Sequence, residues 1–135
     1  MNKYVEIKNW LESNSFGDIR INASSDVAEI SPITIKTVAN DNTLRNFVDG
    51  TKEKRLEFVV GFTLEYSEEF DDVNDIALER VEQFKTDLLS CSNLPNFGAD
   101  VIINNVETAE TPSISVDFDG KIAYYQLSCF VKYMQ

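Results

Sequence analysis

The sequence predicts an α+β domain in which two helices pack on one face of a largely antiparallel sheet. Three observations lead to this prediction. Apolar and polar residues alternate over 55–66, apolar residues recur at helical spacing over 71–90, and an Asp-Gly pair divides two alternating segments near the C-terminus. The chain has 135 residues, of which 43% are hydrophobic, so we expect a single domain over 1–135 with one buried core.

The N-terminal third predicts one helix followed by two strands. Residues 4–13 predict a short amphipathic helix, because their apolar side chains fall on one stripe. Residues 19–23 alternate as a half-buried strand does. A second strand is expected within 27–38, where Pro32 either marks its beginning or places it at a sheet edge.

Residues 39–54 are polar and too many for a tight turn, so they predict a long connecting loop between the second and third strands. This loop contains three apolar residues, Leu44, Phe47 and Val48, with no evident helix or strand to bury them. Two interpretations stay open, since these side chains either fold back over the core or anchor a neighbouring subunit. Trp10 is expected to pack in the core, with a subunit contact as its second candidate role.

The third strand and the second helix carry the clearest periodicities. Alternation over 55–66 gives a strand of about 36 Å, about twice the common length, so we expect part of it to contact another subunit. Residues 71–90 predict the main helix, with a Leu-Pro stop at 94–95. The β-branched residues of 101–106 predict a further strand.

The C-terminal segment predicts a β-hairpin with a defined register. The Asp-Gly pair at 119–120 is typical of a two-residue hairpin turn. Such a turn pairs Val116 with Ala123 and Ile114 with Tyr125. The same register places the apolar residues of the last strand on one face, as alternation alone does, so turn and pattern agree.

The composition argues against an enzyme and against a bound cofactor. The chain has no histidine, which removes the Ser/His and Cys/His nucleophile pairs and the usual zinc sites. Its five glycines are scattered, so no phosphate-binding loop or dinucleotide fingerprint exists. Cys91 and Cys129 are expected to be reduced and buried, unless the fold brings their Cα atoms within about 7 Å for a disulfide. We expect no catalytic residue, no metal ligand and no cofactor.

One run of carboxylates surrounds the start of the second helix. Such a cluster is able to bind Ca²⁺ or Mg²⁺, but the calcium-loop spacing is absent. Helix capping and the helix dipole explain acidic residues at this position more simply. We expect this acidic patch to form part of a ring surface or a DNA channel. It consists of Glu65, Glu68, Glu69, Asp71, Asp72 and Asp75.

Charge and hydropathy restrict the partners. The net charge of −11 argues against nucleic-acid binding, because Lys and Arg supply that affinity. No apolar run is long enough to span a bilayer, and the N-terminus lacks the order of a signal peptide. We therefore expect synthesis in the cytosol, no specific nucleic-acid binding and no membrane association.

The order and spacing of these features resemble the tail-terminator and minor capsid proteins of long-tailed bacteriophages. The likeness covers an opening helix, strands, a long middle loop, the strand at 55–67, a helix, a Leu-Pro stop before Gly98, and a terminal hairpin at 117–120. It implies a hexameric ring in the virion neck, made in the host cytoplasm. The ring would stop tail-tube polymerisation and contact the tail-tube protein on one side and head–tail connector proteins on the other. The resemblance implies no catalytic residues.

Two other functions are consistent with the sequence. Another phage neck component, such as a head-completion or stopper protein, would also be small, acidic and oligomeric. A cellular α+β ligand-binding domain would instead be a monomer or dimer with a defined apolar pocket.

Overall fold

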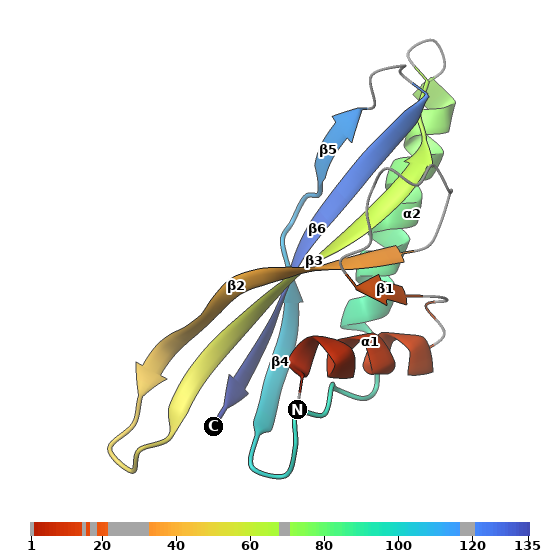
Figure 1. The fold of residues 1–135 in the computed structure, drawn as a ribbon. Coiled ribbons are helices and arrows are strands. Elements are labelled where there is room, and N and C mark those ends of the chain that lie inside the picture. Colours follow the sequence, from red (N-terminus) through yellow and green to blue (C-terminus); the bar gives the residue numbers. More distant parts are fainter. Residues whose placement is uncertain (1, 15, 17–18, 22–32, 68–70, 117–120) are drawn as a thin grey trace.

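A computed structural model describes residues 2–14, 16, 19–21, 33–67, 71–116 and 121–135, without the side chains of 39–42 and 71. It confirms the predicted α+β class with a mostly antiparallel sheet (Figure 1). The elements in chain order are α1 (Lys3–Ser13), β1 (Ile19–Ile21), β2 (Ile33–Asn46), β3 (Lys52–Glu65), α2 (Asp71–Leu89), β4 (Ile102–Thr108), β5 (Ser113–Val116) and β6 (Ile122–Met134).

The sheet is built around β3 and β6, which pair antiparallel along almost their whole lengths. Its strand order is β1-β2-β3-β6-β4, and β5 pairs with β6 beyond β4. β1 and β2 run parallel, whereas the other paired strands run antiparallel. The end of the β2–β3 hairpin projects past the C-terminus, away from both helices (Figure 1).

The long loop predicted over 39–54 is wrong. β2 continues to Asn46 and β3 begins at Lys52, so only a short turn separates the two strands. Their register shifts at two places, between Thr37 and Asp41 and between Thr43 and Arg45. Such bulges interrupt the alternation that marks a strand, and backbone pairing with β3 overrides the low strand propensity of the Asn and Asp residues.

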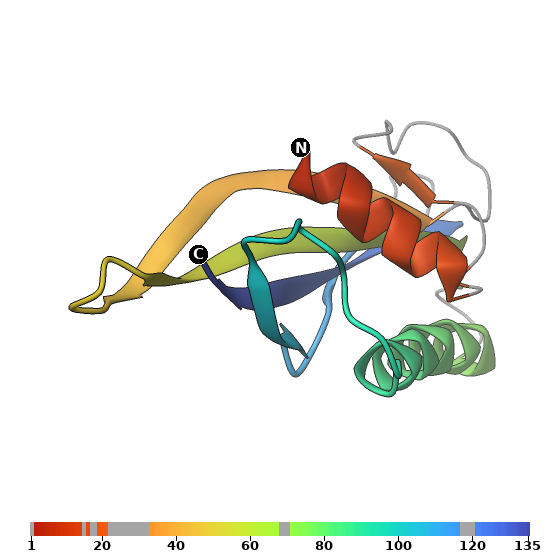
Figure 2. The same cartoon turned by 90° about the horizontal axis from the view of Figure 1, so that it is seen from below.

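Both helices pack on one face of the sheet, as predicted (Figure 2). The α2 ring of Phe84 meets Phe62 of β3 edge to face, with centroids 5.1 Å apart. From α1, the Lys3 ammonium donates to the Tyr133 hydroxyl of β6 at 2.8 Å. Below the helices, buried side chains of β3 and β6 form the floor of the core. They are Leu56, Phe58, Val60, Phe62, Leu64, Ala123, Tyr125, Leu127, Cys129, Val131 and Tyr133.

The predicted register of the C-terminal hairpin is confirmed. Val116 pairs with Ala123 and Ile114 pairs with Tyr125. The Asp-Gly turn itself, within 117–120, lies outside the described residues. The agreement follows from the side-chain period of two, since a slip by one residue would turn the apolar face of β6 away from the core.

Candidate subunit interface

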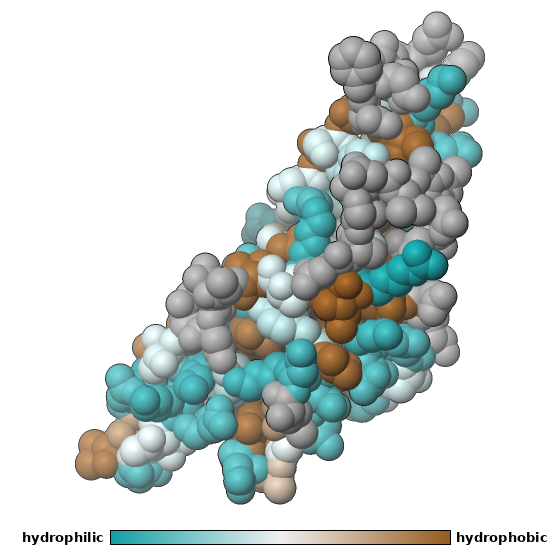
Figure 3. Space-filling model, in the orientation of Figure 1, coloured by the Kyte–Doolittle hydropathy of each residue, from teal (hydrophilic) through white to brown (hydrophobic). Residues whose placement is uncertain are grey.

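The apolar residues of the supposed loop lie at the end of the β2–β3 hairpin. We call residues 43–55, the distal part of this hairpin, the arm. Val48 is fully exposed, and Leu44 and Phe47 are 42% and 41% exposed. None of the three belongs to the core cluster that the described residues form. Figure 3 shows apolar surface at the very end of the arm. The interpretation in which Leu44, Phe47 and Val48 fold back over the core is therefore wrong.

The turn at the arm's end is closed by its own hydrogen bonds. The Phe47 amide donates to the Thr51 carbonyl at 2.8 Å, and the Gly50 amide donates to the Phe47 carbonyl at 3.0 Å. Gly50 has a φ of 89°, a conformation that favours glycine. The Asp49 carboxylate accepts from the Thr51 amide at 3.0 Å, and this bonding lowers the pKa of Asp49. The turn thus holds Phe47 and Val48 outward in a defined conformation.

The arm is basic within an acidic chain. Residues 45–55 include four basic and two acidic residues, although the chain as a whole carries a net charge of −11. Arg45 lies 3.7 Å from Glu53, and its side chain is 74% exposed. An ion pair this exposed contributes little to stability, so the Arg45 guanidinium is available to a partner.

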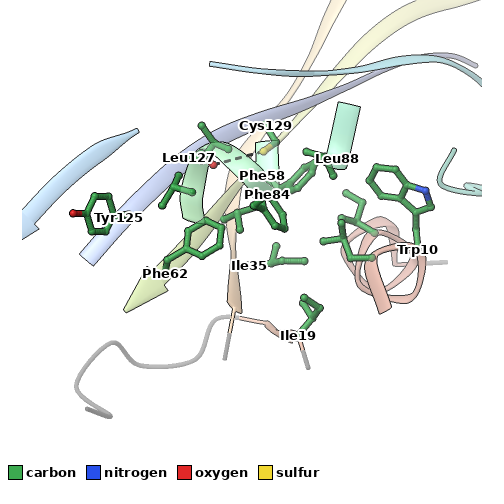
Figure 4. Close-up of a cluster of buried hydrophobic side chains, with 14 of the residues drawn as sticks. Trp10, Ile19, Ile35, Phe58, Phe62, Phe84, Leu88, Tyr125, Leu127 and Cys129 are labelled. Atoms are coloured by element: carbon green, nitrogen blue, oxygen red, sulfur yellow. Dashed lines mark hydrogen bonds between the residues drawn. The ribbon is translucent and has the colours of Figure 1, made fainter. Parts of the chain in front are cut away.

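Trp10 does not form part of an exposed interface, which corrects its second candidate role. The side chain is only 5% exposed, and it belongs to the buried cluster drawn in Figure 4. Its indole Nε1–H donates to the Asn93 carbonyl at 3.1 Å, which ties α1 to the segment after α2. The spacing of residues in the sequence could not decide whether Trp10 is buried. Trp10 lies beside the apolar stripe of α1, and its burial depends on the segment after α2.

The acidic patch is described only in part. Glu65, at the end of β3, and Asp72 and Asp75, in the first turns of α2, are exposed. Glu68 and Glu69 lie outside the described residues, as does the side chain of Asp71. Within the described part of the chain, no three His, Cys, Asp or Glu residues are placed to hold a metal ion.

A small apolar pocket between β3 and α2 was not predicted from the sequence. Its volume is about 180 Å³, and it is lined by Leu64, Glu65, Val73, Ile76, Ala77 and Arg80. Ile76 is 66% exposed, although it falls near the apolar spacing of the helix. The buried residues of α2 are Ala77, Val81, Phe84 and Leu88, which form one stripe along the helix. Ile76 is about 100° away from Ala77 around the helix, and so lies off the buried stripe. This offset is the sequence signal that could have identified Ile76 as exposed.

The two cysteines are free thiols in the structure, one half-buried and one buried. Burial raises the pKa of Cys129 well above its ordinary value. Burial, together with the nearby charge of Asp87, raises the pKa of Cys91. Both therefore carry a proton at neutral pH, and neither has the thiolate character of a nucleophile.

Comparison with known proteins places no further constraint on the site. No family model matches the chain, and a search of curated proteins finds no match. In the described ranges, neither helix is long and apolar enough to cross a membrane. The resemblance to tail terminators therefore stays a prediction from the sequence, and the long middle loop that formed part of it is a β-hairpin in the structure.

Proposed function

We propose that this chain is a structural virion subunit that caps a phage tail tube as a ring. In this role it ends tail polymerisation and forms the joining surface for the head connector. The observation that carries the proposal is the arm, where Phe47 and Val48 are held outward by a closed turn. Exposed apolar residues concentrated at one projecting point are typical of a protein–protein contact.

Two further observations support a structural role. A strongly acidic chain repels DNA phosphates, which suits a ring through which DNA passes without sticking. The pocket beside α2, at about 180 Å³, is smaller than the roughly 300–1,000 Å³ typical of small-molecule sites. A larger hollow of about 490 Å³ on α2 is lined mainly by polar residues, among them Asp75, Glu79 and Glu82, so neither of the two is the defined apolar pocket expected of a ligand-binding domain. Another neck component would use the same arm, and binding to purified tail tubes separates the two roles.

The double variant Phe47→Ala with Val48→Ala is expected to weaken assembly while leaving the fold of the subunit intact. Interface energy concentrates in a few apolar residues, and truncating such residues costs about 2 kcal/mol or more in binding. Both side chains lie outside the core, so the melting temperature of the dilute monomer should change little. Sedimentation of concentrated protein, alone and mixed with tail tubes, measures assembly, and thermal unfolding measures stability.

A matched control truncates exposed apolar residues outside the arm, Val5→Ala with Leu94→Ala, and should assemble like the wild type. If the arm variant instead loses several kcal/mol of monomer stability, its residues belong to the core. If it assembles as well as the control, the arm is not the interface.

A further inference from the structure

The arm and the α2 pocket lie at opposite ends of the same strand. β3 begins at Lys52 in the arm, and Leu64 near its other end lines the pocket. These two residues are roughly 40 Å apart along an extended strand. The arm of one subunit therefore cannot reach its own pocket, and any contact between them joins two copies.

The pocket has the size and polarity to receive an apolar side chain. Its lining is mainly apolar, and exposed Ile76 forms part of its rim. A volume of about 180 Å³ suits one large side chain better than a whole small molecule. Phe47 and Val48 are the outermost apolar residues of the arm turn, so they provide side chains of the required kind.

The charges around the two surfaces are opposite. Residues 71–89 of α2 include six acidic and two basic residues. Glu65 lines the pocket together with Arg80, and Asp72 is exposed beside the pocket residue Val73. The arm carries the reverse excess, with four basic and two acidic residues over 45–55. Opposite potentials steer two surfaces together and fix their register.

We infer that the arm of one copy docks on the α2 pocket of a second copy, with its apolar turn in the pocket and Arg45 and Lys52 facing the acidic residues of α2. This contact uses two different patches, so it is heterologous and generates a ring when its rotation closes. The inference rests on the proposed ring function and adds the pair of surfaces that meet.

Two charge-reversed chains test this docking. The first carries Arg45→Glu with Lys52→Glu on the arm, and the second carries Glu65→Lys with Asp72→Lys at the pocket. In each chain alone, the arm and the pocket surface carry charges of the same sign. Its assembly should therefore weaken roughly tenfold or more relative to the wild type. In an equimolar mixture, every arm finds a surface of opposite charge if the two chains alternate. The mixture should therefore regain wild-type assembly in a 1:1 ratio, measured by native mass spectrometry with one chain isotope-labelled.

The outcomes separate the docking from the ring itself. If the wild type forms rings but the single chains assemble equally well, or the mixture is not restored, the arm does not dock on α2 and the ring proposal survives. If the wild type stays monomeric at every concentration, both proposals fail. Added salt should weaken wild-type assembly, because it screens these exposed charges.

Discussion

Val60→Asp is expected to abolish soluble folding. Val60 is fully buried in the middle of β3, where its neighbours across the sheet are Ile35 and Leu127. Both neighbours are also buried, so an introduced carboxylate would have no ionic or hydrogen-bonding partner there. Burying an unpaired charge belongs to the few mechanisms that cost more than about 4 kcal/mol, against a total stability of about 5–15 kcal/mol. Soluble yield and circular dichroism measure the effect.

Val59→Asp provides the matched control for this variant. Val59 is the adjacent residue on the opposite, half-buried face of β3, paired with Lys36 and Ser128. A carboxylate here remains near solvent and faces a lysine, so the variant should fold with only a modest loss of stability. A soluble Val60→Asp protein that melts at the wild-type temperature would contradict the assignment of the core face.

Trp10→Ala is expected to have the second largest effect, a loss of about 3–5 kcal/mol of folding free energy, as for other large core truncations. The variant removes a buried ring and leaves the Asn93 carbonyl without its indole donor. Urea unfolding measures the change. Trp10→Phe, which keeps most of the packing and loses the hydrogen bond, should fall between the wild type and Trp10→Ala.

Assembly distinguishes the two roles considered for Trp10. At temperatures where Trp10→Ala remains folded, the variant should assemble like the wild type, because the residue lies inside the subunit. If Trp10→Ala kept wild-type stability but lost assembly, Trp10 would be an interface residue and its assignment to the core would be wrong.

The sequence predicted those elements whose periodicity and turn chemistry are local. The alternation of β3 and the register of the C-terminal hairpin depend on a period of two, and both are present in the structure. The distal half of β2 could not be predicted in this way. Its polar residues become a strand only because β3 pairs with them, and two register shifts conceal the alternation.

The candidate interface was predicted only in part for a related reason. Leu44, Phe47 and Val48 stood out because they are apolar within a polar segment, and they are exposed on the arm. The α2 pocket is formed jointly by β3 and α2. Its rim residue Ile76 looks like a core residue until the direction of the buried stripe is known, so tertiary packing supplies the missing information.

Native mass spectrometry of the wild-type protein over a range of concentrations tests the ring most directly. A heterologous contact that closes produces one dominant oligomer, and the resemblance to tail terminators implies that this oligomer is a hexamer of the 15.3 kDa chain. We expect the monomer to give way to this single closed species as concentration rises, without a ladder of larger forms. A chain that remains monomeric at every concentration, or that forms an open-ended series, would contradict the ring.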